Sequence, residues 1–149
     1  MNAILPFNCP TCHAQHHASV YQAEHHGLRW GFGFHCAQCS DAFEFDDVGV
    51  PDEPYRHVLL EQDGTWLLEP SSGAKSFSVH TWIRLRHALA LDLTTLARLK
   101  ALPHRVRIKG TAVEMNWLAQ QCSEPVSIRQ GGESELHDAF DFATLFSSR

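Results

Sequence analysis

The sequence predicts an α+β protein built from three successive parts: a small three-stranded unit held by cysteines, a central β-hairpin, and a unit with the order β-α-α-β-α-β. Three observations lead to this prediction. Two Cys-x-x-Cys pairs flank an alternating apolar stretch near the start, an Asp-Gly dipeptide separates two apolar runs, and the apolar period becomes helical after residue 75. The expected segments are 1–50, 51–74, 75–130 and an acidic amphipathic tail at 131–149.

Composition excludes several classes of protein. In 149 residues, 44% are hydrophobic and 19% charged, which is typical of a folded globular chain and not of a disordered one. No window approaches the roughly 20 apolar residues that span a bilayer, and the first residues do not resemble a signal peptide. We therefore expect a cytoplasmic protein, in which thiols stay reduced and cysteines more often bind metal than form disulfides.

The two cysteine pairs predict a tetrahedral metal site. Cys9, Cys12, Cys36 and Cys39 supply four thiolates, the ligand set that Zn²⁺ prefers, and Cys122 is left over. A rubredoxin-like iron site would use the same sulfurs, but nothing else in the sequence indicates electron transfer. A thioredoxin-type redox pair would need one Cys-x-x-Cys at the start of a helix, and neither pair has such neighbours.

The stretch "NCPTCHAQHH…WGFGFHCAQCS" resembles the zinc ribbons, over about residues 7–47. The resemblance implies one structural zinc ion and three strands, in "HASVYQ", "LRWGFGF" and "DAFEFDD". The glycine that usually follows each knuckle is replaced here by His13 and Ser40. Histidines are frequent in this region, so one of them could replace a sulfur or bind a second ion. We expect His25 and His26 to form an exposed turn.

The segment "YRHVLLEQDGTWLLEP" predicts the central hairpin, because Asp63-Gly64 between apolar runs favours a two-residue turn. The acidic, proline-containing stretch before it predicts a linker.

The third part is basic. Residues 75–130 carry nine Lys or Arg against three acidic residues, whereas residues 1–74 carry two against ten. The predicted elements are a strand at "SFSVH", two helices joined near the N-cap Asp92, a strand "HRVRIKG", a helix opened by a Thr111–Glu114 capping box, and a strand "PVSIRQ". The outward positions of these strands form a predicted basic partner-binding surface, which consists of Arg105, Arg107, Lys109 and Arg129.

The order of these elements, with "WIRLRHALALDLTTLARLKALPHRVRIKG" and "GTAVEMNWLAQQC…VSIRQ", resembles the C-terminal domain of the bacterial ribosomal stalk protein over about residues 76–130. The resemblance implies the fold. It does not carry over the binding of translation factors, because the helical lysines are largely replaced, for example by Ile83 and Thr94. Both glycines of the family's elbow are also absent from "ALDL", Ala90 to Leu93.

No catalytic motif is present, so the sequence favours a non-enzymatic, zinc-containing adaptor that binds a protein partner. Two alternatives remain open. A nucleic-acid- or ribosome-associated factor would use the ribbon and the basic surface, and a metal-dependent hydrolase would use the histidines. The sequence determines neither the partner nor the oligomeric state. It also leaves open whether the tail covers its own core or binds elsewhere.

Overall fold

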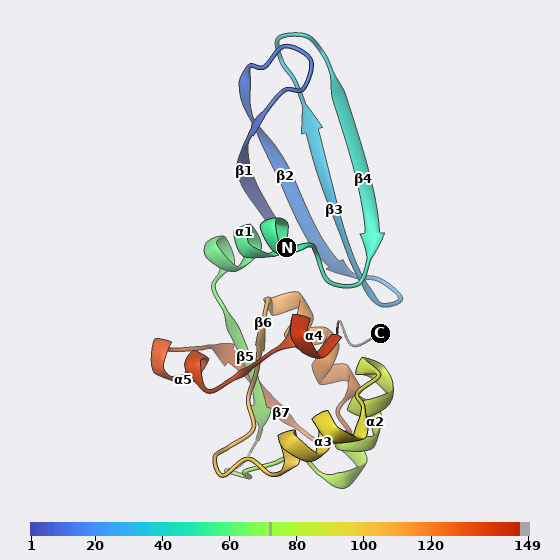
Figure 1. The fold of residues 1–149 in the computed structure, drawn as a ribbon, viewed down its shortest axis with the longest axis vertical. Helices are drawn as coiled ribbons and strands as arrows, with labels where there is room; N and C mark the ends of the chain where they lie inside the picture. The colour runs from blue at the N-terminus through green and yellow to red at the C-terminus, as the bar shows by residue number, and fades with distance from the viewer. Residues whose placement is uncertain (72, 147–149) are drawn as a thin grey trace. The chain divides into compact units, whose positions relative to one another are not determined.

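In the computed structural model, which describes residues 1–71 and 73–146, the chain forms two compact units, residues 1–64 and 65–149. The fold is mixed α+β, with one sheet in each unit (Figure 1). Among the described residues, no helix is long and apolar enough to cross a membrane.

The first unit is an antiparallel sheet in the order β1-β2-β3-β4. Its strands are β1 (Asn2–Asn8), β2 (Gln15–Glu24), β3 (Leu28–His35) and β4 (Ala42–Val48). The prediction of three strands omitted β1, which contains Pro6. Met1 exchanges hydrogen bonds with Gln22 of β2, and Cys9 N donates to Ala14 O, so the odd-numbered residues of β1 bond with β2. The Pro6 nitrogen therefore points away from β2, on the outer side of this edge strand, and the proline costs the sheet no hydrogen bond.

One face of this sheet forms the core of the first unit. Leu28, Trp30, Phe32 and Phe34 of β3 are buried, as their alternation predicted. Helix α1 (Glu53–Asp63) covers part of that face with Leu59, which is fully buried, and with Tyr55, whose ring lies 5.3 Å from those of Trp30 and Phe32.

The predicted central hairpin is wrong. Residues 53–63 form α1, and Gly64 ends it with φ 81° and an N–H bond to Leu60 O of 3.0 Å. A glycine with positive φ suits a helix end as well as a hairpin turn, and Pro54 suits a first helical turn. The apolar run before Asp63 therefore supplies one helix face, and the run after Gly64 becomes strand β5 (Trp66–Pro70) of the second unit.

The second unit combines a mixed sheet in the order β7-β5-β6-β8 with five helices among its described residues. Its remaining strands are β6 (Ile108–Gly110), β7 (Val126–Gln130) and β8 (Phe140–Asp141), and its helices are α2 (Val79–Leu89), α3 (Leu93–Lys100), α4 (Ala112–Gln121), α5 (Glu133–His137) and α6 (Phe142–Phe146).

The order of β5 to β7 matches the predicted β-α-α-β-α-β, but the first strand is not "SFSVH". Ser78 instead caps α2 by accepting a hydrogen bond from Thr81 N, and β5 takes the strand position. The other predicted caps are confirmed, Asp92 on α3 and the Thr111–Glu114 capping box on α4.

The described part of the tail, residues 131–146, covers the core of its own unit, and residues 147–149 lie outside the described residues. Phe142 and Leu145 are buried, and β8 pairs in parallel with β6. Trp117 of α4 packs against this segment, with its ring 5.9 Å from that of Phe142.

Candidate metal centre

The two cysteine pairs form matching turns at one end of the first sheet. Cys9 and Cys12 lie between β1 and β2, and Cys36 and Cys39 lie between β3 and β4. In the first turn, His13 N donates to Cys9 O and Cys9 N donates to Ala14 O, both at 2.9 Å. Ser40 N and Cys36 N repeat this pattern in the second turn, with Cys36 O and Asp41 O as acceptors at 3.0 and 2.7 Å. Each pair is therefore a knuckle held by its own backbone.

The residues that replace the usual glycines adopt the conformation that glycine would provide. His13 has φ 59° and Ser40 has φ 60°. The left-handed backbone that follows each knuckle is thus kept despite the side-chain cost, and the two substitutions leave the geometry of the turns intact.

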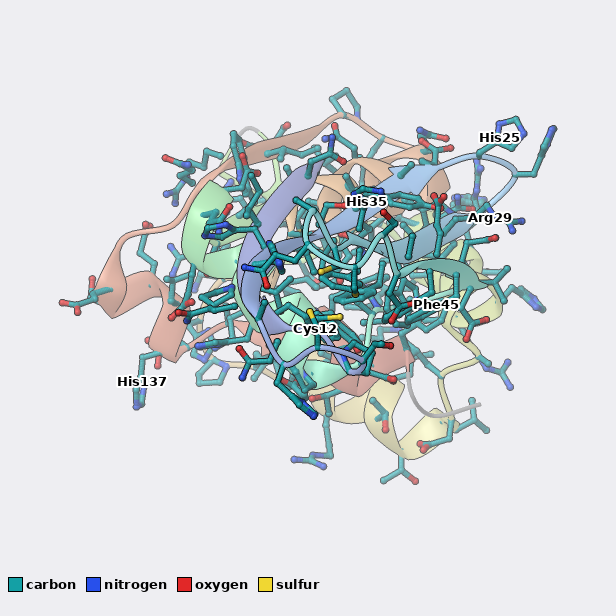
Figure 2. All side chains as sticks on the ribbon, turned by 90° about the horizontal axis from the view of Figure 1, so that it is seen from above. Cys12, His25, Arg29, His35, Phe45 and His137 are labelled. Atoms are coloured by element: carbon teal, nitrogen blue, oxygen red, sulfur yellow. The ribbon has the colours of Figure 1, made fainter. Side chains whose placement is uncertain are left out.

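The four sulfurs converge (Figure 2, where sulfur atoms gather beside Cys12). All four Sγ atoms lie within 4.8 Å of one another, and the pairs Cys9–Cys39 and Cys12–Cys36 are each 3.5 Å apart. Ligands about 2.3 Å from a tetrahedral ion are separated by about 3.8 Å, so this cluster fits a tetrathiolate metal site. Within the described residues it is the one group of three or more His, Cys, Asp or Glu side chains close enough to hold an ion.

The surroundings of the sulfurs stabilise the closed cluster. Thr11 Oγ1 of the first knuckle donates to Asp41 Oδ2 beside the second at 2.7 Å. His16 Nε2 lies 3.3 Å from Cys36 Sγ, so this histidine contacts a ligand sulfur from outside the four-cysteine set. The sequence showed that histidines were abundant here, but only the pairing of β2 with its neighbours selects His16.

Two other histidines of this region lie away from the sulfurs. His25 and His26 form the exposed β2–β3 turn, as predicted, and His25 projects well away from Cys12 (Figure 2).

The thiols of the cluster differ strongly in acidity. Burial tends to raise the pKa of Cys36, but the backbone N–H groups of Cys39 and Gln38 and the neighbouring thiols lower it to about 6. At Cys39 the Asp41 N–H acts to lower the pKa, yet burial and the other three sulfurs raise it to about 12. The low pKa of Cys36 favours its thiolate near neutral pH, whereas deprotonation of Cys39 would be favoured by a bound cation.

Three of the four predicted partner-binding residues surround a buried carboxylate. Glu69 of β5 is only 5% exposed, and Arg107 Nε and Arg129 Nε lie 3.1 and 3.3 Å from its oxygens. Arg105 also contacts Glu69, at 3.7 Å, and donates to Pro70 O. Lys109 Nζ instead donates to Leu136 O at 2.9 Å.

Helix α5 covers the face of the sheet that was expected to be open. The guanidinium group of Arg129 donates to both carboxylate oxygens of Glu135, to Oε2 at 2.7 Å and to Oε1 at 2.6 Å. This hydrogen-bonded guanidinium lowers the pKa of Glu135 to about 2, and the same contact raises the pKa of Arg129. The basic side chains are therefore brought together, but the chain's own acidic residues already neutralise much of their charge.

Cys122 is not part of the four-cysteine cluster. Its Sγ donates to Leu118 O at 3.6 Å, and burial raises the pKa of its thiol to about 12, which makes it unreactive near neutral pH.

No family model matches this chain, and neither the curated proteins nor the solved structures contain a significantly similar one.

Proposed function

We propose that this chain is a non-enzymatic zinc-containing protein that binds another protein. The observation that carries the proposal is the closed set of four converging cysteine sulfurs. Four thiolates complete the tetrahedral coordination of Zn²⁺ and leave no position for a reacting water, so the ion would act as a structural element. It would join the β1–β2 turn to the β3–β4 turn and so fix the shape of the first sheet.

The outer strand of this sheet, β4, exposes aromatic side chains. Every residue of β4 is exposed, and Phe43 and Phe45 remain 40% and 39% exposed although their rings belong to the aromatic core face. Aromatic side chains at a rigid, accessible edge are typical of protein interfaces. This surface supports protein binding better than it supports catalysis.

A nucleic-acid-binding function is the alternative, and the charges weigh against it. The first unit is acidic, and Arg105, Arg107 and Arg129 are engaged by Glu69 and Glu135. Phosphate binding at this surface would have to displace internal ion pairs.

Elemental analysis with native mass spectrometry tests the metal part of the proposal. We expect one zinc ion per chain, retained under mild chelation. Two ions, or one ion lost at once, would instead favour a reactive site that includes histidine.

Affinity capture with the tagged full chain tests the binding part. We expect a stoichiometric protein partner that is recovered equally with and without nuclease treatment. Loss of the captured material after nuclease treatment, together with its loss in an Arg107→Glu, Arg129→Glu variant, would support the nucleic-acid alternative.

A further inference from the structure

The two edge strands of the first sheet, β1 and β4, differ in whether another part of the unit bonds to their outer side. At the β1 edge, the side-chain amide of Gln62 in α1 accepts from Ile4 N at 3.0 Å and donates to Ile4 O at 2.5 Å. This pair of hydrogen bonds imitates the contact that a neighbouring strand would make, so α1 occupies the β1 edge at Ile4. No described strand pairs with the outer edge of β4, and all seven of its residues are exposed.

The backbone pattern identifies which groups β4 offers. Gly49 N donates to Leu28 O and Cys36 N donates to Asp41 O, so the odd-numbered residues of β4 face β3. The N–H and C=O groups of Ala42, Glu44 and Asp46 consequently point outward. Val48 N also points outward but is already bonded to Asp47 Oδ1, at 2.7 Å. The usable edge therefore runs from Ala42 to Asp46.

The side chains of this edge divide by chemistry between the two faces of the sheet. Phe43 and Phe45 lie on the aromatic face, beside Phe34 and Phe32. Glu44 and Asp46 lie on the opposite face, where Arg29 contacts Asp46 at 2.5 Å. Glu44 also borders a groove of about 700 Å³ across that face, next to Gly33 and His35.

This division determines what can add to the edge. In an extended partner, alternate side chains point to opposite faces, so a complementary strand would place basic residues beside Glu44 and Asp46 and apolar residues beside the phenylalanines. A second copy of β4 is a poor occupant, because antiparallel pairing centred on Phe45 would set Glu44 opposite Asp46 of the other copy.

We propose that the free β4 edge binds an extended segment of a partner protein in which basic and apolar residues alternate, and that this segment becomes a fifth strand of the sheet. The inference rests on the proposed protein-binding function and specifies its site and the chemistry of its partner. Backbone hydrogen bonds to Ala42, Glu44 and Asp46 would supply affinity, and the two faces would supply selectivity.

The test uses the full-length, metal-loaded protein and two capped seven-residue peptides of equal composition and charge. One peptide alternates lysine and valine, and the other has all its lysines before all its valines. Titrations followed by amide NMR and hydrogen exchange should show that the alternating peptide binds at least about tenfold more tightly. It should also slow exchange at Ala42, Glu44 and Asp46. Equal affinity for both peptides, or protection elsewhere, would overturn the proposal.

Two charge-reversal variants complete the test. Glu44→Lys should weaken binding of the alternating peptide about tenfold, because a like charge then faces its lysines. Glu61→Lys makes the same change in net charge on the exposed surface of α1 and should leave affinity unchanged. Equal loss in both variants would indicate general charge attraction. Protection of the β4 amides without peptide, increasing with protein concentration, would instead indicate self-pairing; either result contradicts the proposal.

Affinity capture separates failure of this site from failure of the proposed function. If Glu44→Lys recovers the same partner as the unaltered chain, the β4 site is wrong while protein binding stands. If neither form captures a protein, the proposed function itself fails.

Discussion

At the scale of single residues, left-handed backbone at positions without glycine is a repeated feature of this chain. His13 and Ser40 adopt it after the knuckles, and Ala90 adopts it at the C-cap of α2 with φ 52°. Ala90 is followed by Leu91 and by Asp92, the N-cap of α3, so the left-handed residue lies at the junction of the two helices. An alanine pays a steric cost there that glycine would avoid.

Ala90→Gly should therefore stabilise the second unit, by about 0.5 to 1 kcal/mol, because relief of the strain exceeds the added flexibility of the unfolded chain. Urea unfolding followed by the fluorescence of the tryptophans measures this change. Ala88→Gly, two residues earlier and within the last turn of α2, is the control and should destabilise by about 1 kcal/mol. A loss of stability in Ala90→Gly would show that the left-handed backbone is not strained.

The Glu135–Arg129 contact makes stability depend on pH at the acid end. The pKa of Glu135 is about 2 in the folded chain, below its ordinary value of 4.5, so the unfolded chain takes up the proton first as pH falls. The stabilisation is complete above about pH 5 and should be lost between about pH 4.5 and 2. Glu135→Gln should remove that part of the acid transition, which unfolding measured across this range would detect. Glu133→Gln, on the exposed start of α5, should keep it; identical profiles for both variants would exclude the role given to Glu135.

At the scale of elements, the sequence predicted turns and helix caps, which depend on neighbouring residues, but not the contacts between segments that are distant in sequence. The knuckles and the caps at Asp92 and Thr111 depend on hydrogen bonds within a few residues, and the structure has them where the sequence placed them. Asp63-Gly64 was misleading because a helix end and a hairpin turn both accept glycine with positive φ. The cover over the basic strand residues was not predicted, because α5, which contacts Arg107 and Lys109, is distant from them in sequence.

The metal site should determine the stability of the elements that it joins. Cys36→Ser removes one ligand and should abolish tight metal binding and strongly destabilise β1 to β4, because metal affinity contributes directly to folding. Metal content and hydrogen exchange across residues 2–48 measure the effect. Cys122→Ser removes a thiol outside the cluster and should leave the metal content unchanged. Unchanged protection of the first sheet in Cys36→Ser would show that the sulfurs do not hold it.

At the scale of the whole molecule, each unit has its own sheet and its own buried side chains. The core of the first unit contains Ala3, Val20, Phe32 and Leu59, all from residues 1–64, and the four-cysteine cluster belongs to the same unit. The second unit is built around residues such as Leu68, Leu85, Ile108 and Met115.

Removal of the metal should consequently unfold one unit and spare the other. In the presence of a strong chelator, amides of residues 2–48 should exchange rapidly, while those of β5 and α4 keep their protection. Hydrogen exchange with mass spectrometry measures both in one experiment, and readdition of zinc should restore the slow pattern. Loss of protection in both units together would show that they fold as one cooperative body.

The Gln62 amide on β1 also sets a limit on how large an assembly can become. A sheet with two free edges can recruit strand after strand, and such growth leads to filaments. In this sheet the Gln62 amide already occupies the β1 edge at Ile4, so among the described residues β4 is the edge of the first sheet that remains open to a further strand. Complexes formed through this sheet should therefore contain one partner strand for each copy of the chain, and their size should not increase with concentration.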